Sequence, residues 1–386
     1  MRLLRDFFRP VLLVTCLAFG AANAVGCGGD SNQESATDAS LVDGSSLDAS
    51  LLDASSVDGS PVTPPAPEGP LDSASVFFSG HSLINLETPN FFRQIGQRQG
   101  LASNYQLQMG LGSAIRFRLS CPMNGQEADG TDISYNLATE LAQVGTYDTL
   151  ILTENHNIMG MIAFEASTAM ALRFVDLFRA GSANGRVFLF ETWIGVGTAP
   201  SSATNTQLQT WLDRVAREKV AWQCLASKVN EHRELASPMR LVPASQALAA
   251  VVADVRAGNA PGITSLDQIF ADDVHLEHLG NYLMALLHYG VSYQRSPIGV
   301  ASTSLAPLFD TAFDVPPATA NYLQTLAARY VNQTFDDAAD SQRTTAACLT
   351  ALADVCSQSP DATDWLCNTA IPAAFNAIDE PVPGCS

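Results

Sequence analysis

From residue 75 onward the chain alternates short apolar runs with longer stretches of helical character, and this alternation most restricts its fold. The predicted strands lie in residues 75–80, 105–110, 148–155, 185–193 and the start of 239–258. The predicted helices lie in 88–100, 163–181, 206–232 and the rest of 239–258. Strands that alternate with helices form a parallel sheet covered on both faces. We therefore predict an α/β fold, a three-layer α/β/α sandwich with a parallel sheet.

Polar residues that follow the predicted strands are the first candidates for a functional site, because ligands of such sheets bind beyond the carboxyl ends of the strands. Ser82 follows the first strand, Asn155 the third, and Glu191 the fourth. Far downstream, Asp272 and His275 stand three residues apart, directly before a predicted helix. This spacing lets a carboxylate hold one nitrogen of the imidazole while the other takes a proton. A serine hydroxyl needs such a base to act as a nucleophile, and without one Ser82 is a turn residue.

Two segments carry a resemblance to a known family. The segment GHSL at 80–83 resembles the Gly-Asp-Ser-Leu block of the SGNH hydrolases, with histidine in place of aspartate, and DDVH at 272–275 resembles their Asp-x-x-His block. The resemblance covers about residues 72–295. It implies a flavodoxin-like hydrolase fold and a serine ester hydrolase that needs no metal or organic cofactor. Ser82 would be the nucleophile, His275 the general base and Asp272 the group that orients it.

The same resemblance implies an oxyanion hole and a substrate class. The donors would be the backbone N–H of Ser82, a glycine after the second strand and an asparagine after the third. Gly112 matches the glycine position best, with Gly110 as the alternative, and Asn155 stands at the asparagine position among neighbours that differ from the family pattern. The acyl group would belong to an acetylated polysaccharide, a lipid or a small ester, and analogy with the family favours short acyl groups on glycans.

Several nearby residues have two interpretations each. His81, Glu154 and His156 are candidate pocket residues, although His81 also fits a turn that supports the site from outside. Glu191 and Trp193 either line the pocket or pack, whereas His278 and His288 are expected to be structural. We expect no metal site, because no spacing of ligands supports one.

The N-terminal region indicates export. Residues 1–26 combine a basic start with a short apolar run, as in a signal peptide. The segment AVGC at 24–27 resembles a bacterial lipobox, which would make Cys27 a lipidated anchor at the membrane; cleavage after Ala24 and free secretion is the alternative. Residues 27–71 are rich in Ser, Asp and Pro and lack aromatic residues, so we expect a disordered tether.

Residues 72–335 would form the hydrolase-like domain and residues 336–386 a cysteine-rich appendage. We expect the four cysteines of the appendage, Cys348, Cys356, Cys367 and Cys385, to form two disulfides among themselves in an oxidising compartment. The net charge of −19 argues against a nucleic-acid partner. Because the first and third blocks depart from the family pattern, the alternative function is a non-catalytic surface binding or adhesion lipoprotein on the same fold.

Overall fold

The computed structural model describes residues 69–121, 123–127, 132–135, 141, 147–307, 310–336, 342–359 and 362–382. These residues belong to one compact unit, Pro64–Ser386. The predicted signal peptide, Cys27, Cys385 and nearly all of the predicted tether lie outside the described residues.

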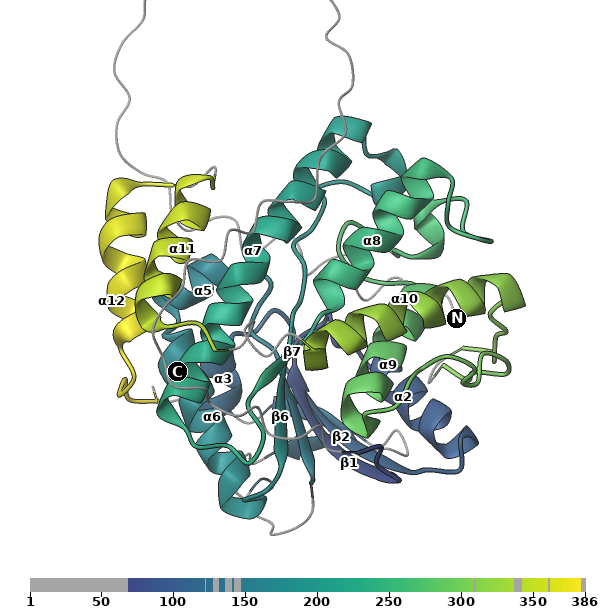
Figure 1. Ribbon diagram of the computed structural model, residues 1–386, viewed down its shortest axis with the longest axis horizontal. Helices are drawn as coiled ribbons and strands as arrows, with labels where there is room; N and C mark the ends of the chain where they lie inside the picture. The colour runs from purple at the N-terminus through teal and green to yellow at the C-terminus, as the bar shows by residue number, and fades with distance from the viewer. Residues whose placement is uncertain are drawn as a thin grey trace, which may run out of the picture. The chain divides into compact units, whose positions relative to one another are not determined.

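A seven-stranded sheet in the order β4-β3-β2-β1-β5-β6-β7 forms the middle layer (Figure 1). Its parallel strands are β1 (Ser73–Gly80), β2 (Ala102–Met109), β5 (Thr149–Leu152), β6 (Arg186–Phe190) and β7 (Arg240–Val242). Counted along the chain, the parallel strands follow the order 2-1-3-4-5, which is the flavodoxin-like doubly wound order. This confirms the predicted sandwich. An antiparallel hairpin that we did not predict, β3 (Met123–Glu127) and β4 (Asp132–Tyr135), extends the β2 edge.

Helices cover both faces because successive side chains of a strand point to opposite sides of the sheet. Phe77 and Phe78 of β1 thus belong to two separate hydrophobic cores. The core of Phe78 is covered by α2 (Glu87–Arg98), α8 (Ala244–Ala257), α9 (His278–Tyr293) and α10 (Pro317–Asp336). The core of Phe77 is covered by α3 (Ile115–Ser120), α5 (Ile158–Phe164), α6 (Ser167–Gly181), α11 (Thr345–Ser357) and α12 (Ile371–Asn376). The long helix α7 (Asn205–His232) contributes to both cores.

At the start of α2 the side-chain oxygen of Asn85 accepts hydrogen bonds from the backbone N–H groups of Glu87 (2.7 Å) and Thr88 (3.2 Å). One predicted helix needs correction. The single helix predicted over 163–181 is broken at Ala166, whose φ of 50° lies in the left-handed region. The two pieces, α5 and α6, meet at 88°. Within the described ranges no single helix is long and apolar enough to cross a membrane, and this bent pair alone passes such a test, by length and composition.

The C-terminal segment is attached to the main domain differently from our expectation. Cys348 of α11 forms a disulfide with Cys224 of α7, and Cys356 forms one with Cys367 in the short helical turn η5 (Leu366–Ala370). The prediction that the tail cysteines pair only among themselves is therefore wrong. Cys348 is fully buried where α11 packs on α7, so it faces Cys224 and not its own segment. Figure 1 shows α11 and α12, in yellow, beside α5 and α7. Both disulfides are compatible with an extracytoplasmic protein.

Candidate active site

The turn after β1 presents Ser82 at the carboxyl edge of the sheet. Gly80 ends the strand. A Cβ atom at this position would come within 2.9 Å of the Ile84 side chain, so the turn leaves no room for a larger residue. His81 is buried; its Nε2–H donates to the carbonyl of Glu154 (3.1 Å), and its Nδ1 accepts from the Leu83 N–H (3.4 Å). Burial, and next the positive charge of Arg118, lower the pKa of His81 well below its ordinary value. A neutral His81 thus fixes the turn beneath Ser82.

His275 lies between Ser82 and Asp272 in one chain of hydrogen bonds. Its Nε2 is 3.0 Å from the Ser82 Oγ, and its Nδ1 is 2.7 Å from an Asp272 carboxylate oxygen. The other Asp272 oxygen accepts from the backbone N–H groups of Val274 (2.9 Å) and His275 (2.7 Å). Burial opposes ionisation of Asp272, but these hydrogen bonds outweigh it and lower the pKa of the carboxyl. The structure therefore brings together the three residues that we predicted, Ser82, Asp272 and His275.

The loop that carries His275 is held by the neighbouring strand end. The indole N–H of Trp193 donates to the Val274 carbonyl (2.8 Å), and the Val196 N–H donates to the Asp273 carbonyl (3.0 Å). Trp193 is 1% exposed, so its role here is to hold this loop. Glu191 is also fully buried and accepts a hydrogen bond from Gln246 (3.2 Å) on α8, which takes it away from an open pocket.

A polar network joins the start of α2, which follows Ser82 in the chain, to the start of α9, which follows His275. The Asn85 amide donates to the side-chain oxygen of Asn281 (2.7 Å), and the Asn281 amide donates to Glu87 (3.0 Å). Glu87 also contacts the Nδ1 of His278 at 2.8 Å, and this hydrogen bond raises the pKa of His278. The network couples the positions of the two loops, and sequence reasoning missed all of it except a structural role for His278.

His288 has the structural role that we expected. Its ring lies between those of Phe78 and Phe190, at centroid distances of 5.2 and 4.8 Å. Burial lowers the pKa of His288 to about 3, so the imidazole is a neutral core group.

The two loops predicted to bind an oxyanion contact one another. The N–H of Gly110, our alternative donor, is already donated to the Gly80 carbonyl (3.0 Å), which leaves Gly112 as the glycine candidate. Gly112 has a φ of 62°, in the left-handed region that favours glycine. The Asn155 amide donates to the Gly112 carbonyl (2.8 Å), while the Asn155 N–H donates to Glu154 (2.7 Å). Gly112 and Asn155 are thereby fixed relative to each other.

Arg118, which the sequence did not single out, lies buried beneath these loops and connects them. Its guanidinium donates to the Ser79 Oγ (3.0 Å), to the carbonyl (2.8 Å) and Oγ (3.0 Å) of Ser113, and to the Thr153 carbonyl. It thus joins the ends of β1 and β5 to the loop after β2. Burial lowers the pKa of Arg118 to about 10, so it keeps its charge at neutral pH.

Glu154 lies close enough to Arg118 for the two groups to interact electrostatically. It is fully buried, and one carboxylate oxygen accepts from the backbone N–H groups of Ile115 (3.0 Å) and Asn155 (2.7 Å). Burial raises the pKa of Glu154, and the charge of Arg118 is the strongest effect that opposes this rise. Glu154 and His81 were candidate pocket residues, but their burial places both beneath the site, closed to a substrate.

His156 is the third candidate pocket residue, and it lies partly exposed beside the site. Burial, followed by the charges of His275 and Arg214, lowers the pKa of His156. His156 therefore lies within electrostatic reach of His275 on one side and of Arg214 in α7 on the other. No group of three His, Cys, Asp or Glu side chains in the described part of the chain could hold a metal ion.

Comparison with known proteins adds one structural likeness. No protein-family model matches the chain, and no curated protein matches it. The structure is similar to the crystal structure of a DUF4886 family protein from Bacteroides uniformis, with 14% sequence identity and a TM-score of 0.47, over 68% of this chain and 95% of that chain. By its own fold and geometry, the protein is an α/β sandwich with a Ser–His–Asp chain of hydrogen bonds at the carboxyl edge of a parallel sheet.

Proposed function

We propose that this protein is a serine ester hydrolase of the SGNH type. The observation that carries the proposal is the hydrogen-bonded chain from Asp272 through His275 to Ser82, with distances of 2.7 and 3.0 Å. Such a chain gives a serine hydroxyl the base that it needs to attack a carbonyl carbon. No step of this chemistry requires a metal or an organic cofactor.

The catalytic cycle follows from the positions of the three side chains. The Ser82 Oγ attacks the ester carbonyl while the His275 Nε2 takes its proton. The imidazolium then gives that proton to the departing alcohol, which leaves an acyl group on Ser82. Water, deprotonated by His275, releases the acid and restores the serine. Asp272 holds the Nδ1–H tautomer of His275 throughout and stabilises the imidazolium.

Negative charge that develops on the carbonyl oxygen would be bound by the N–H groups of Ser82 and Gly112 and by the Asn155 amide. An amide nitrogen carries two hydrogens. One Asn155 N–H is donated to the Gly112 carbonyl, and the other, which donates to no group in the described part of the chain, would bind the substrate. Each such donor typically contributes about 10²–10³-fold to the rate.

The exposure of the site favours an ester on a large substrate. The side chain of His275 is 39% exposed and that of Asp272 is 52% exposed. An acyl group on a glycan chain can reach a site so open to solvent. We therefore assign short acyl esters, including O-acetyl groups on glycans, as the substrate class.

The test of this function is labelling by a serine-reactive fluorophosphonate. The wild-type protein should be labelled, and Ser82→Ala should abolish the labelling, because the reagent reacts only with an activated nucleophile. Ser201→Ala, which removes an exposed serine elsewhere, is the matched control and should be labelled normally. Labelling that persists in Ser82→Ala would remove Ser82 from the mechanism, whereas an unlabelled wild type would favour the non-catalytic binding protein.

We further propose that Cys27 is lipidated and anchors the protein to a membrane after export. The support is the sequence AVGC at 24–27, followed by a tether rich in Ser, Asp and Pro. Cys27→Ser should move the protein from the membrane fraction to the soluble fraction in cell fractionation, whereas Cys16→Ser, inside the signal peptide, should leave it at the membrane. A mature wild-type protein that begins at Val25 would contradict lipidation.

A further inference from the structure

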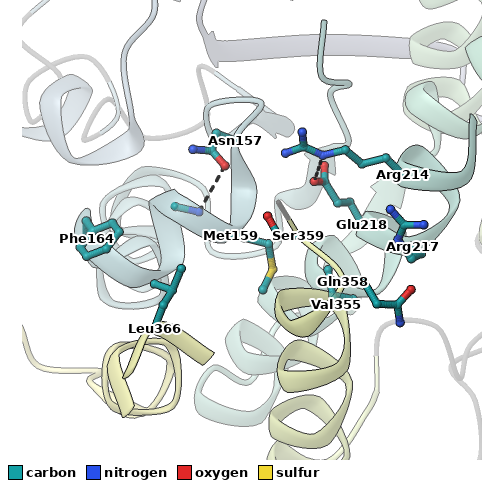
Figure 2. A pocket seen from close by; sticks show the side chains of 11 residues that line it. Asn157, Met159, Phe164, Arg214, Arg217, Glu218, Val355, Gln358, Ser359 and Leu366 are labelled. Atoms are coloured by element: carbon teal, nitrogen blue, oxygen red, sulfur yellow. Dashed lines mark hydrogen bonds and ion pairs between the residues drawn. The ribbon is translucent and has the colours of Figure 1, made fainter. Parts of the chain in front are cut away.

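A pocket of about 180 Å³ lies between α5, α7 and the C-terminal segment (Figure 2). Asn157 and Phe164 contribute from α5 and the residue before it, Arg214 and Arg217 from α7, and Leu366 from η5. Pockets for drug-sized ligands measure about 300–1,000 Å³. This smaller pocket therefore suits one compact group, such as a single sugar unit of a longer chain.

The pocket is positively charged in a strongly acidic protein. The chain has 20 Lys and Arg residues against 39 Asp and Glu residues, yet two arginines and one glutamate line this wall. The Arg214 Nε contacts a Glu218 carboxylate oxygen at 2.6 Å. Arg214 and Glu218 thus balance each other's charge, and Arg217 adds one positive charge to the wall. No hydrogen bond or ion pair to Arg217 is formed by the rest of the described chain, and its charge acts only at longer range, on Glu218. Figure 2 shows these three side chains on the α7 wall.

An arginine without an ion-pair partner favours a planar anion. A guanidinium donates two parallel hydrogen bonds to a carboxylate, which makes this pairing both strong and directional. The other walls are largely apolar and include Met159, Phe164, Val355 and Leu366. The C–H faces of a sugar ring can pack on such side chains while a carboxylate on the same ring reaches Arg217.

The pocket adjoins the candidate active site. The Asn157 N–H donates to the side-chain oxygen of Asn155 (3.1 Å), so pocket and oxyanion loop share one turn of chain. Between them lies His156, which responds to the charges of both His275 and Arg214. Residues 155–157 therefore connect the pocket wall directly to the loop that carries Asn155.

We infer that this pocket binds the carboxylate-bearing sugar unit of an acidic glycan whose acyl ester is hydrolysed at Ser82. The hydrolysis of an ester at Ser82 rests on the proposed function. The binding of a carboxylate rests only on the residues of the pocket. Arg217 is the residue that selects an acidic glycan over a neutral one.

The C-terminal segment is then part of the substrate site. Val355, Ser359 and Leu366 form its share of the pocket wall. The Cys356–Cys367 disulfide fixes α11 to η5 at that wall, and the Cys224–Cys348 disulfide fixes α11 to α7. Because these cross-links hold the wall in place, residues 342–382 do more than stabilise the domain.

The direct test is binding of trigalacturonate and of a neutral galactose trisaccharide to the full-length Ser82→Ala protein, measured by calorimetry with the disulfides intact. Trigalacturonate should bind saturably and the neutral sugar much more weakly. Arg217→Gln in the same background should weaken trigalacturonate binding by about tenfold or more, since a hydrogen bond to a charged group is lost. Arg329→Gln is the matched control: it removes the same charge from an exposed position on α10 and should leave binding unchanged. Absence of saturable binding, or equal binding by Arg217→Gln, would overturn the inference.

Turnover separates this inference from the proposed function. With active enzyme, Arg217→Gln should raise KM for O-acetylated trigalacturonate about tenfold or more, whereas Arg329→Gln should leave this KM unchanged. Ser82-dependent hydrolysis of 4-nitrophenyl acetate without trigalacturonate binding would overturn the pocket assignment alone. Arg217-dependent binding without fluorophosphonate labelling would overturn the esterase and keep the acidic-glycan site.

Discussion

Replacing His275 by alanine is expected to lower kcat/KM for an ester substrate by about 10⁴-fold or more. The physical reason is that the His275 Nε2, 3.0 Å from the Ser82 Oγ, is the group placed to take the serine proton. Steady-state hydrolysis of 4-nitrophenyl acetate measures the effect. The residual rate should match that of Ser82→Ala, because the two residues act as a unit and their effects do not add.

A pair of neighbouring aspartates provides the control for this prediction. Asp272→Asn should cost about 10⁴-fold, because an amide stabilises the wrong tautomer of His275. Asp273→Asn should leave the rate within about threefold of wild type, because Asp273 accepts a hydrogen bond from the Val196 N–H through its backbone carbonyl, which the substitution keeps. If Asp273→Asn were the severe change and Asp272→Asn the mild one, the assignment of the orienting residue would be wrong.

The second large effect is expected in Arg118→Met, which should lower the free energy of unfolding by about 3–5 kcal/mol. The substitution takes a charged donor from the buried carbonyls of Ser113 and Thr153 and removes the positive charge that opposes the raised pKa of Glu154. Ester hydrolysis should also fall, by about 10²-fold, since small displacements of Gly112 and Asn155 misplace the oxyanion donors. Denaturant unfolding and steady-state kinetics on the same preparation measure both effects.

Arg116→Met is the matched control for Arg118→Met because it removes a second arginine from the same short helix. Arg116 forms a partly exposed ion pair with Glu165 at 2.5 Å, and such pairs contribute only about 0–1 kcal/mol. The double variant Arg118→Met/Glu154→Gln should recover part of the lost stability, since no uncompensated charge remains. Wild-type stability and activity of Arg118→Met would show that the buried pair does not position the loops.

Much of the fold and part of the site follow from local patterns. Alternating apolar and helical stretches predicted the parallel sandwich, because a strand between two helix layers must be apolar on both sides. The Asp272–His275 pair was predictable because a spacing of three residues brings the two side chains together within one turn, whatever the rest of the chain does. Ser82 was predictable from its place at the end of the first strand, where parallel sheets put their sites.

The sequence by itself therefore determined the layer architecture and pointed to Ser82, Asp272 and His275, which the structure joins by hydrogen bonds. Only the tertiary structure decided what surrounds these residues: Arg118 beneath the oxyanion loops, Glu87 between the two loop helices, the Cys224–Cys348 cross-link and Arg217 in its pocket. The physical reason is the separation along the chain of the residues that interact. A strand, a turn or a spacing of three residues is set by neighbours along the chain, whereas a buried arginine or a disulfide across 124 residues finds its partner only after the sheet has assembled and the helices have packed.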